Sequence, residues 1–202
     1  MRTYKRKKLI WISFLILDTF LHKTSRIEIL EHLVKRGYTV YLIAVWSRRK
    51  YEPENSQIHI ISIPLRYVPG ISPLLFVGIL LFFLPYYIIF VNPDFIVTEP
   101  DMSVFGFIWV PLLSRFRRFK LVLDIRSTPV ETVRLGPIMN TFVFNVGVFL
   151  AKGFFDGMTI ITIQMKEEIC DKFHINSRFG VWTSGVSPTL FNPKKYDKEA
   201  TK

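Results

Sequence analysis

The sequence predicts an α/β domain built on a Rossmann-like, doubly wound parallel sheet of about seven strands, with helices on both faces. Short apolar runs of strand length alternate along the chain with segments of helical periodicity. These runs are apolar at nearly every position, which is typical of parallel strands buried on both faces. The first strand, helix and strand follow one another within about 40 residues, a length that suits a βαβ unit.

The first of these units comprises a strand at 9–17, a helix and a strand at 38–45. We expect the helix to begin at Ser25, because Ser25 and Glu28 have the spacing of a capping box. In such a box the serine hydroxyl accepts from the Glu28 amide, and the carboxylate reaches back to the Ser25 amide. Gly37 is the expected C-cap, since glycine adopts the left-handed conformation that commonly ends a helix.

The same alternation continues through the rest of the chain. Asn92-Pro93-Asp94 is a turn signal before a strand, and Thr162 is the expected N-cap of a late helix. The expected strands lie at 58–63, 95–98, 121–124, 158–162 and 179–182, and the expected helices at 71–91, 102–113, from 137 towards 152 and from 162 through 169.

The composition is that of one folded domain with short tails. The chain has 202 residues, of which 50% are hydrophobic, so it can bury a core of useful size. We expect a basic N-terminal tail at 1–8, the Rossmann-like domain at 9–193, and a polar linker or tail at 194–202 that leads towards a further domain.

The strongly basic charge indicates an acidic partner. The formal net charge is +11, which favours nucleic acid, an anionic lipid surface or a phosphate-bearing substrate. We exclude nucleic acid as the expected partner, because the aromatic residues fall within apolar runs and do not alternate with the basic clusters as a stacking surface requires. An anionic membrane surface remains the expected partner.

One long apolar segment bears on location. No charged residue occurs from 67 to 93, and a helix at 71–91 is long enough to span a bilayer. The alternative is a buried helix that covers one face of the sheet, and we favour a helix that is partly core and partly pressed into a membrane surface. Cys170 is the single cysteine, which excludes an internal disulfide and fits a reducing compartment. We therefore expect a cytoplasmic protein, peripheral on the cytoplasmic face of the membrane.

Ligands of doubly wound sheets bind at the carboxyl ends of the strands, which selects four loops. These loops lie at 18–24, 99–103, 124–131 and 184–187, and their polar residues are the candidate site.

Several strings of residues, in order, resemble the N-terminal domain of group 1 glycosyltransferases, which are retaining enzymes of the GT-B fold. They include Arg36-Gly37-Tyr38-Thr39-Val40, Asn92-Pro93-Asp94-Phe95-Ile96, Leu123-Asp124-Ile125-Arg126, Asp156-Gly157-Met158-Thr159-Ile160, and Ser184-Gly185-Val186 followed by Leu190-Phe191-Asn192-Pro193. The chain departs from the family in three places: the loop at 18–24 lacks glycine, the late turn has serine where asparagine is usual, and Arg126 stands where many relatives have histidine.

The resemblance implies the acceptor-binding half of a membrane-associated glycosyltransferase. Such an enzyme transfers a sugar from a nucleotide-sugar to a glycan or lipid-linked acceptor, without a bound metal. The donor-binding C-terminal domain, or a separate donor subunit, is the implied partner, and the chain alone is expected to bind no cofactor and to be inactive. The alternative is a non-catalytic module that recruits a split glycosyltransferase to the membrane.

Arg126 and Asp124 are the expected catalytic residues. Arg126, at the end of a strand, can hold a phosphate or pyrophosphate in a bidentate fork; a salt bridge to Asp124 or Glu131 is the alternative. Asp124 can orient an acceptor hydroxyl or hold Arg126 in place, and an ordinary turn residue at the strand end is equally consistent.

The expected substrate-binding residues come from all four loops. His22 and Lys23 precede the first helix, where an anionic substrate would feel both the cation and the helix dipole; for His22 an ordinary exposed loop histidine is the alternative. Glu99 and Asp101 can bind sugar hydroxyls or cap the next helix. The remaining expected residues are Ser127, Ser184 and Gly185.

Overall fold

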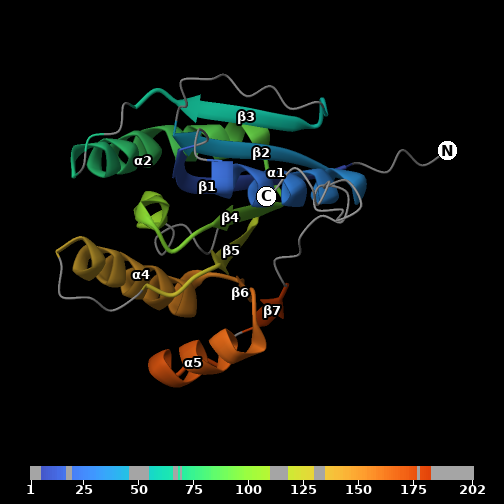
Figure 1. Cartoon of the computed structure of the whole chain (residues 1–202). Coiled ribbons are helices and arrows are strands. Elements are labelled where there is room, and N and C mark those ends of the chain that lie inside the picture. Colours follow the sequence, from blue (N-terminus) through green and yellow to red (C-terminus); the bar gives the residue numbers. More distant parts are fainter. Residues whose placement is uncertain are drawn as a thin grey trace, which may run out of the picture.

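The structure, a computed structural model, describes residues 6–16, 20–45, 55–65, 68, 70–109, 118–129, 135–176 and 178–182. Its framework is a single sheet of seven parallel strands in the order β3-β2-β1-β4-β5-β6-β7 (Figure 1). The strands are β1 (Lys7–Ile16), β2 (Tyr38–Val45), β3 (Ile58–Ile63), β4 (Phe95–Thr98), β5 (Lys120–Ile125), β6 (Gly157–Ile160) and β7 (Phe179–Val181). The fold class predicted from the sequence is confirmed.

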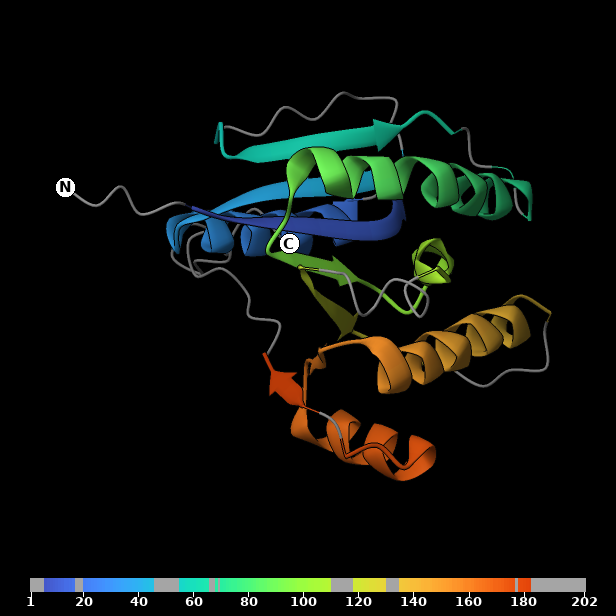
Figure 2. The ribbon, with the colours of Figure 1, turned by 180° about the vertical axis from the view of Figure 1, so that it is seen from behind.

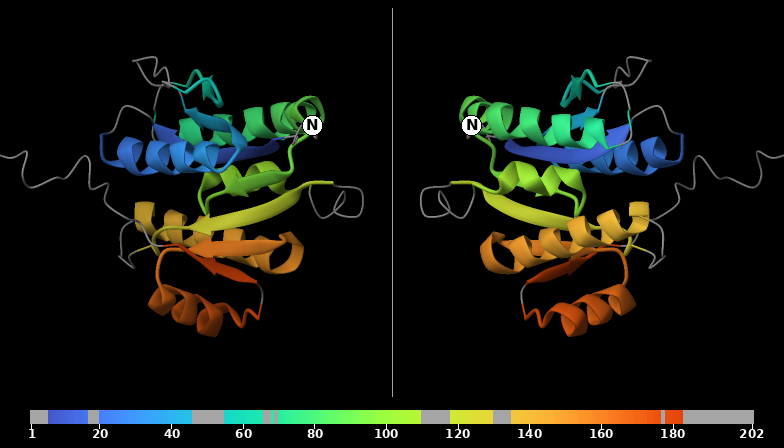
Figure 3. Two further views of the ribbon diagram at one scale, coloured as in Figure 1. Left: turned by 90° about the vertical axis from the view of Figure 1, so that its right-hand side faces the viewer. Right: turned by 90° about the vertical axis from the view of Figure 1, so that its left-hand side faces the viewer.

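The strand order places the first strand in the middle of the sheet. β1 pairs with β2 on one side and with β4 on the other, so the chain winds outwards first in one direction and then in the other. In Figure 3 the strands follow one another down the molecule and turn gradually, which is the twist of a parallel sheet. The carboxyl ends of all seven strands therefore form one edge.

Helices cover the two faces unequally. α1 (Phe20–Lys35) packs on one face, chiefly against β2 and β3, and its buried residues include Leu30 and Val34. The other face carries α2 (Ile71–Val91), the 3-10 helix η1 (Met102–Phe107), α4 (Leu135–Phe154) and α5 (Ile163–Phe173). Figure 2 shows this second face with α2 in front of the strands. We call the two faces the α1 face and the α2 face.

The core consists of apolar strand residues that alternate between these faces. Leu9 and Trp11 of β1 point to the α1 face, whereas Ile10 and Ile12 point to the α2 face. Both sets are buried, and this explains why the strands are apolar at successive positions. The buried side chains make the central strands the rigid base from which the loops at the carboxyl edge extend.

The first helix begins earlier than the sequence suggested. α1 starts at Phe20, so Ser25 lies inside it and the capping box predicted at Ser25 and Glu28 is wrong. No proline or glycine occurs from 20 to 24 to oppose a helix, and a cap contributes only about 1 kcal/mol, which continued helical bonding outweighs. Gly37 does adopt a positive φ of 89° after the helix, as a C-terminal glycine commonly does.

Other boundaries differ by small amounts. β1 begins at Lys7, so Lys7 and Lys8 belong to the sheet, whereas the expected tail extended to residue 8. The segment expected to be helical at 102–113 is a short 3-10 helix that ends at Phe107, and residues 110–117 lie outside the described part of the chain. The predicted cap of α5 is confirmed, because the Thr162 hydroxyl accepts from the Met165 amide at 3.1 Å.

α2 is an integral part of the core despite its membrane-like composition. It is the one helix in the described residues that is long and apolar enough to cross a membrane. Phe76, Leu80 and Leu84 are completely buried in the cluster that α2 forms with η1 and the sheet. The buried positions recur every four residues, which is the spacing of one helical side.

Tyr87 of α2 gives the fold an alkaline sensitivity. Its ring stacks on Phe83 and meets Tyr41 edge to face. Burial, with a smaller effect from Tyr41, raises the pKa of Tyr87 to about 12. An unfolded tyrosine loses its proton near pH 10, so between about pH 10 and pH 12 the unfolded state holds fewer protons and folding stability falls as pH rises.

We therefore expect Tyr87→Phe to reduce the loss of stability above pH 10. The measurement is urea unfolding at pH 9 and pH 11 for both proteins. The unfolding free energy of wild type minus that of Tyr87→Phe should be larger at pH 9 than at pH 11. Tyr86→Phe, on the exposed side of the same helix, is the matched control. An equal difference at both pH values would contradict the expectation.

Candidate functional site

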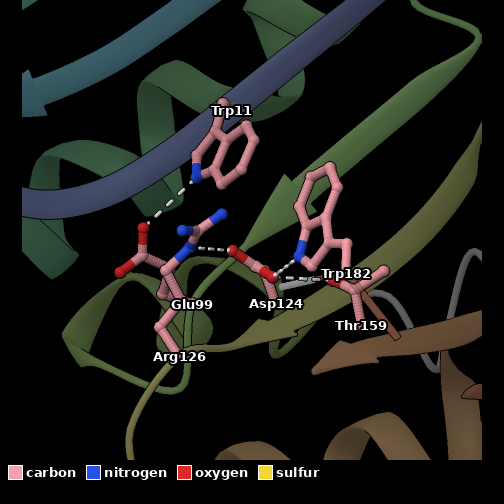
Figure 4. A network of polar contacts seen from close by, with 6 residues as sticks. All are labelled: Trp11, Glu99, Asp124, Arg126, Thr159 and Trp182. Atoms are coloured by element: carbon pink, nitrogen blue, oxygen red, sulfur yellow. Dashed lines mark hydrogen bonds and ion pairs between the residues drawn. The ribbon is translucent and has the colours of Figure 1, made fainter. Parts of the chain in front are cut away.

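A cluster of polar and aromatic side chains occupies the carboxyl edge of the sheet (Figure 4). Arg126 and Glu99 directly follow β5 and β4, and Trp182 directly follows β7. Asp124 and Trp11 lie within β5 and β1. The sheet topology thus brings together residues that are more than 100 positions apart in the sequence.

Asp124 is the centre of this cluster. Its side chain is completely buried. Asp124 and Thr159 are partners in the register of β5 and β6, so both side chains point to the α1 face. The Thr159 hydroxyl and the Trp182 indole N–H donate to Asp124 Oδ1, at 2.7 and 3.0 Å. Arg126 Nε donates to Asp124 Oδ2 at 2.8 Å. A buried carboxylate needs several such donors, and these three are among those that Asp124 has.

The guanidinium group of Arg126 also lies beside two indole rings. The rings of Trp11 and Trp182 are nearly parallel, with 5.9 Å between centroids and 9° between planes. Arg126 Cζ lies 5.7 Å from the Trp11 ring and 5.4 Å from the Trp182 ring. Both distances are within the range of cation–π attraction. Together with the Asp124 bond, the rings fix the orientation of the guanidinium.

Glu99 joins the cluster from β4. Trp11 Nε1 donates to Glu99 Oε1 at 3.2 Å, so the same indole contacts both a carboxylate and a guanidinium. A cation held in a fixed position can stabilise charge on a transferred or departing phosphate without reorganisation. A carboxylate at the same edge can accept from a sugar hydroxyl. The arrangement suits a substrate that carries both groups.

The structure shows the ion pair that was the alternative to phosphate binding for Arg126, and a catalytic role for Arg126 or Asp124 stays a prediction. Arg126 forms the ion pair with Asp124 that the sequence left open, with the Arg126 side chain 14% exposed. The bonds of Asp124 are those of a residue that holds Arg126 in place. Its two oxygens are used by side chains of the domain itself, so we regard Asp124 as a positioning residue and Arg126 as the candidate catalytic one.

Asp101 is a structural cap in this arrangement. Its Oδ1 accepts from the Ser103 amide at 2.7 Å, and its Oδ2 accepts from the Phe14 amide at 2.9 Å. It therefore begins η1 and ties the end of β1 to the loop after β4. A contact between Asp101 and a sugar stays a prediction, as it does for Glu99.

The remaining expected residues are placed less fully. His22 and Lys23 lie in the first turns of α1 rather than ahead of it, because the helix starts at Phe20, and their side chains are outside the described part of the structure. Ser127 is exposed just beyond Arg126. Ser184 and Gly185 fall beyond residue 182, outside the described residues, so the loop at 184–187 stays a prediction.

Three residues of the cluster were missed by the sequence analysis, namely Trp11, Thr159 and Trp182. Each lies inside or next to a strand, where an isolated tryptophan or threonine suggests core packing. Their shared orientation depends on the register between β5, β6 and β7, which one sequence does not reveal. One sequence signal could have placed Trp182. It lies two positions after Gly180, so the two residues face the same side of the last strand.

Within the described residues, no group of three or more histidine, cysteine, aspartate or glutamate side chains is arranged to hold a metal ion. The chemistry of the described cluster is that of one arginine, two carboxylates, one hydroxyl and two indoles.

Comparisons with known proteins give the fold. No protein-family model matches the chain, and no curated protein sequence matches it. Among solved structures, it is similar to a sucrose-phosphate synthase from Thermosynechococcus elongatus, at a TM-score of 0.65 and 12% identity over 92% of this chain and 50% of that one. A UGT transferase from Siraitia grosvenorii, solved with UDP, matches at 0.56 and 10% over 87% and 50%. A glycosyltransferase from Rickettsia africae ESF-5 matches at 0.54 and 13% over 98% and 48%.

The same fold also occurs in a UDP-N-acetylglucosamine 2-epimerase, with a TM-score of 0.54 and 12% identity over 88% of this chain and 48% of that one. The chain spans about half the length of these solved structures. The Rossmann-like sheet, its strand order and the coverage of about half of each solved structure all indicate the same kind of domain. The chain has the fold of one half of a GT-B glycosyltransferase.

Proposed function

We propose that the chain is the N-terminal, acceptor-binding half of a glycosyltransferase. In this proposal a donor-binding half completes the enzyme and holds the nucleotide-sugar, and Arg126 faces the phosphate of the donor across the cleft. The acceptor is a glycan or lipid-linked sugar, the anomeric configuration is retained, and no metal takes part. The proposed location is the cytoplasmic face of the membrane.

The observation that carries the proposal is the fixed cation at the carboxyl edge. Doubly wound sheets bind ligands at this edge, and Arg126 is held there by Asp124 and two indoles. The fold is shared with an epimerase, so it does not by itself select sugar transfer. The strings around Arg36-Gly37, Asp124 and Gly185 favour the glycosyltransferase, because they match the order found in that family.

The test is an assay of the purified chain with and without a donor-binding half. We expect the 202-residue chain to transfer no sugar from a panel of nucleotide-sugars, because it provides one wall of the cleft. Joined to, or mixed with, a donor-binding half encoded downstream or in a neighbouring gene, it should transfer sugar to a lipid-linked acceptor.

Two results would contradict the proposal. Turnover by the chain alone would show that one domain suffices. A chain that binds its donor partner and the membrane but adds nothing to turnover would support the alternative, a non-catalytic recruiting module.

A further inference from the structure

The outer side of α2 is as apolar as its buried side. Phe82, Ile89 and Phe90 are 86%, 80% and 75% exposed. α2 has no charged residue anywhere along its length. A helix that covers a sheet in a water-soluble domain normally turns polar residues outwards. Here the sheet-facing requirement explains Phe76, Leu80 and Leu84 but leaves the outer side unexplained.

The apolar surface extends to the neighbouring helix of the same face. α4 exposes large apolar side chains too, and η1, which contacts both helices, ends beside the exposed Ile108. Figure 2 shows α2, η1 and α4 on this side of the sheet. We call the surface the α2–α4 face; its exposed members are Ile71, Leu74, Leu75, Ile79, Phe82, Tyr86, Ile89, Phe90, Ile108, Ile138, Met139, Phe142 and Phe149.

A groove runs along the outer side of α2. It has a volume of about 630 Å³ and follows successive turns of the helix. Its lining residues are Leu74, Leu75, Gly78, Ile79, Phe82, Phe83 and Tyr86. Gly78 deepens the groove. A Cβ at this position would project into the open space of the groove, since it would meet nothing within 4 Å. Its lining is almost wholly apolar, which suits a hydrocarbon chain and not a sugar or phosphate.

Cations gather at one end of the face. α2 and α4 both end at the amino edge of the sheet, where Lys8 Nζ donates to the Val91 carbonyl at 2.9 Å. Arg118 is exposed just before β5, and Lys152 lies in the last turn of α4. The carboxylates of Asp94 and Asp156 at this edge each accept from a backbone amide. The described charges here are predominantly positive, as an anionic headgroup requires.

We propose that the α2–α4 face docks onto an anionic lipid bilayer, with α2 lying in the plane of the interface and its groove receiving acyl chains. Protein interfaces carry about one hydrogen bond per 100–200 Å², yet Tyr86 is the only exposed residue of α2 with a polar side-chain group. Exposed aromatic side chains on an uncharged helix suit the boundary between headgroups and hydrocarbon. This inference concerns binding and does not depend on sugar transfer.

The experiment is flotation of the full chain with vesicles of phosphatidylcholine containing phosphatidylglycerol. We expect wild type to bind, and to bind less in high salt or to vesicles of phosphatidylcholine alone. Phe82→Gln combined with Phe90→Gln should weaken partitioning about tenfold or more, since both rings would leave the hydrocarbon boundary. Neither ring is buried, so the variant should keep the melting temperature of wild type.

Ile163→Gln is the matched control, because Ile163 is 60% exposed on α5, outside the proposed face. It should bind vesicles as wild type does. The proposal is overturned if wild type fails to bind, or if the double variant binds as well as the control. The face would be assigned to a second copy instead if two results were found together. Wild type would be a dimer without vesicles, and the double variant would be a monomer that binds vesicles as well as wild type. Retention after alkaline washing would show a spanning helix.

Discussion

Arg126→Ala in the completed enzyme is expected to lower kcat by about 100- to 1000-fold, the effect of removing one preorganised group that stabilises charge in a transition state. The guanidinium is fixed by the Nε bond to Asp124 and by two indole rings. Turnover should be measured with saturating nucleotide-sugar, so that the change appears in kcat and not only in donor affinity.

Arg126→Lys separates charge from shape. Lysine keeps the positive charge but lacks the planar fork and the stacking surface, so it should recover only part of the lost rate. Arg36→Ala, at the exposed end of α1, is the matched control and should retain wild-type kcat. Circular dichroism should show that all three variants remain folded. Near-normal turnover of Arg126→Ala would remove this residue from the site.

Asp124→Ala is expected to have the largest effect on stability. The substitution leaves the Thr159 hydroxyl, the Trp182 indole N–H and the Arg126 guanidinium without their common acceptor in a buried position. Breaking a buried charge pair from one side costs about 3–5 kcal/mol of unfolding free energy. For a domain of this size the melting temperature should then fall by about 10 °C.

The contrast with an exposed carboxylate makes this prediction specific. Asp171→Ala, on the outer side of α5, should change the unfolding free energy by less than about 0.5 kcal/mol. Asp124→Asn should lie between the two, because an amide keeps one acceptor but turns a donor towards another group. Near-ultraviolet circular dichroism should also change in the Asp124 variants as the Trp11–Trp182 stack loosens. If Asp124→Ala and Asp171→Ala had the same melting temperature, the central role of the Asp124 carboxylate would be refuted.

The sequence predicted the sheet well for a physical reason. Strands such as β2 and β3 are apolar on both sides, and that signal is local, so their bounds of Tyr38–Val45 and Ile58–Ile63 agree with the expectation. The start of α1 was less predictable, because a capping box at Ser25 and a continued helix differ by little free energy.

The site could be predicted only in part. The rule that ligands bind at the carboxyl edge selected Arg126, Asp124 and Glu99, which the structure brings together. Trp11 and Trp182 escaped notice because their meeting depends on how five strands are ordered and aligned. The same limit applies to the exposed side of α2, since composition alone does not say which residues of an apolar helix face the sheet.

Trp182 is the last residue that the structure describes, and it is tethered twice. Its backbone amide donates to the Ile160 carbonyl at 2.9 Å, and its indole donates to the carboxylate that holds Arg126. A displacement of Trp182 therefore acts on Arg126 in two ways, directly through the contact between ring and guanidinium and indirectly through Asp124. The end of β7 and the Arg126 guanidinium are mechanically coupled, so a small displacement of one would be felt at the other.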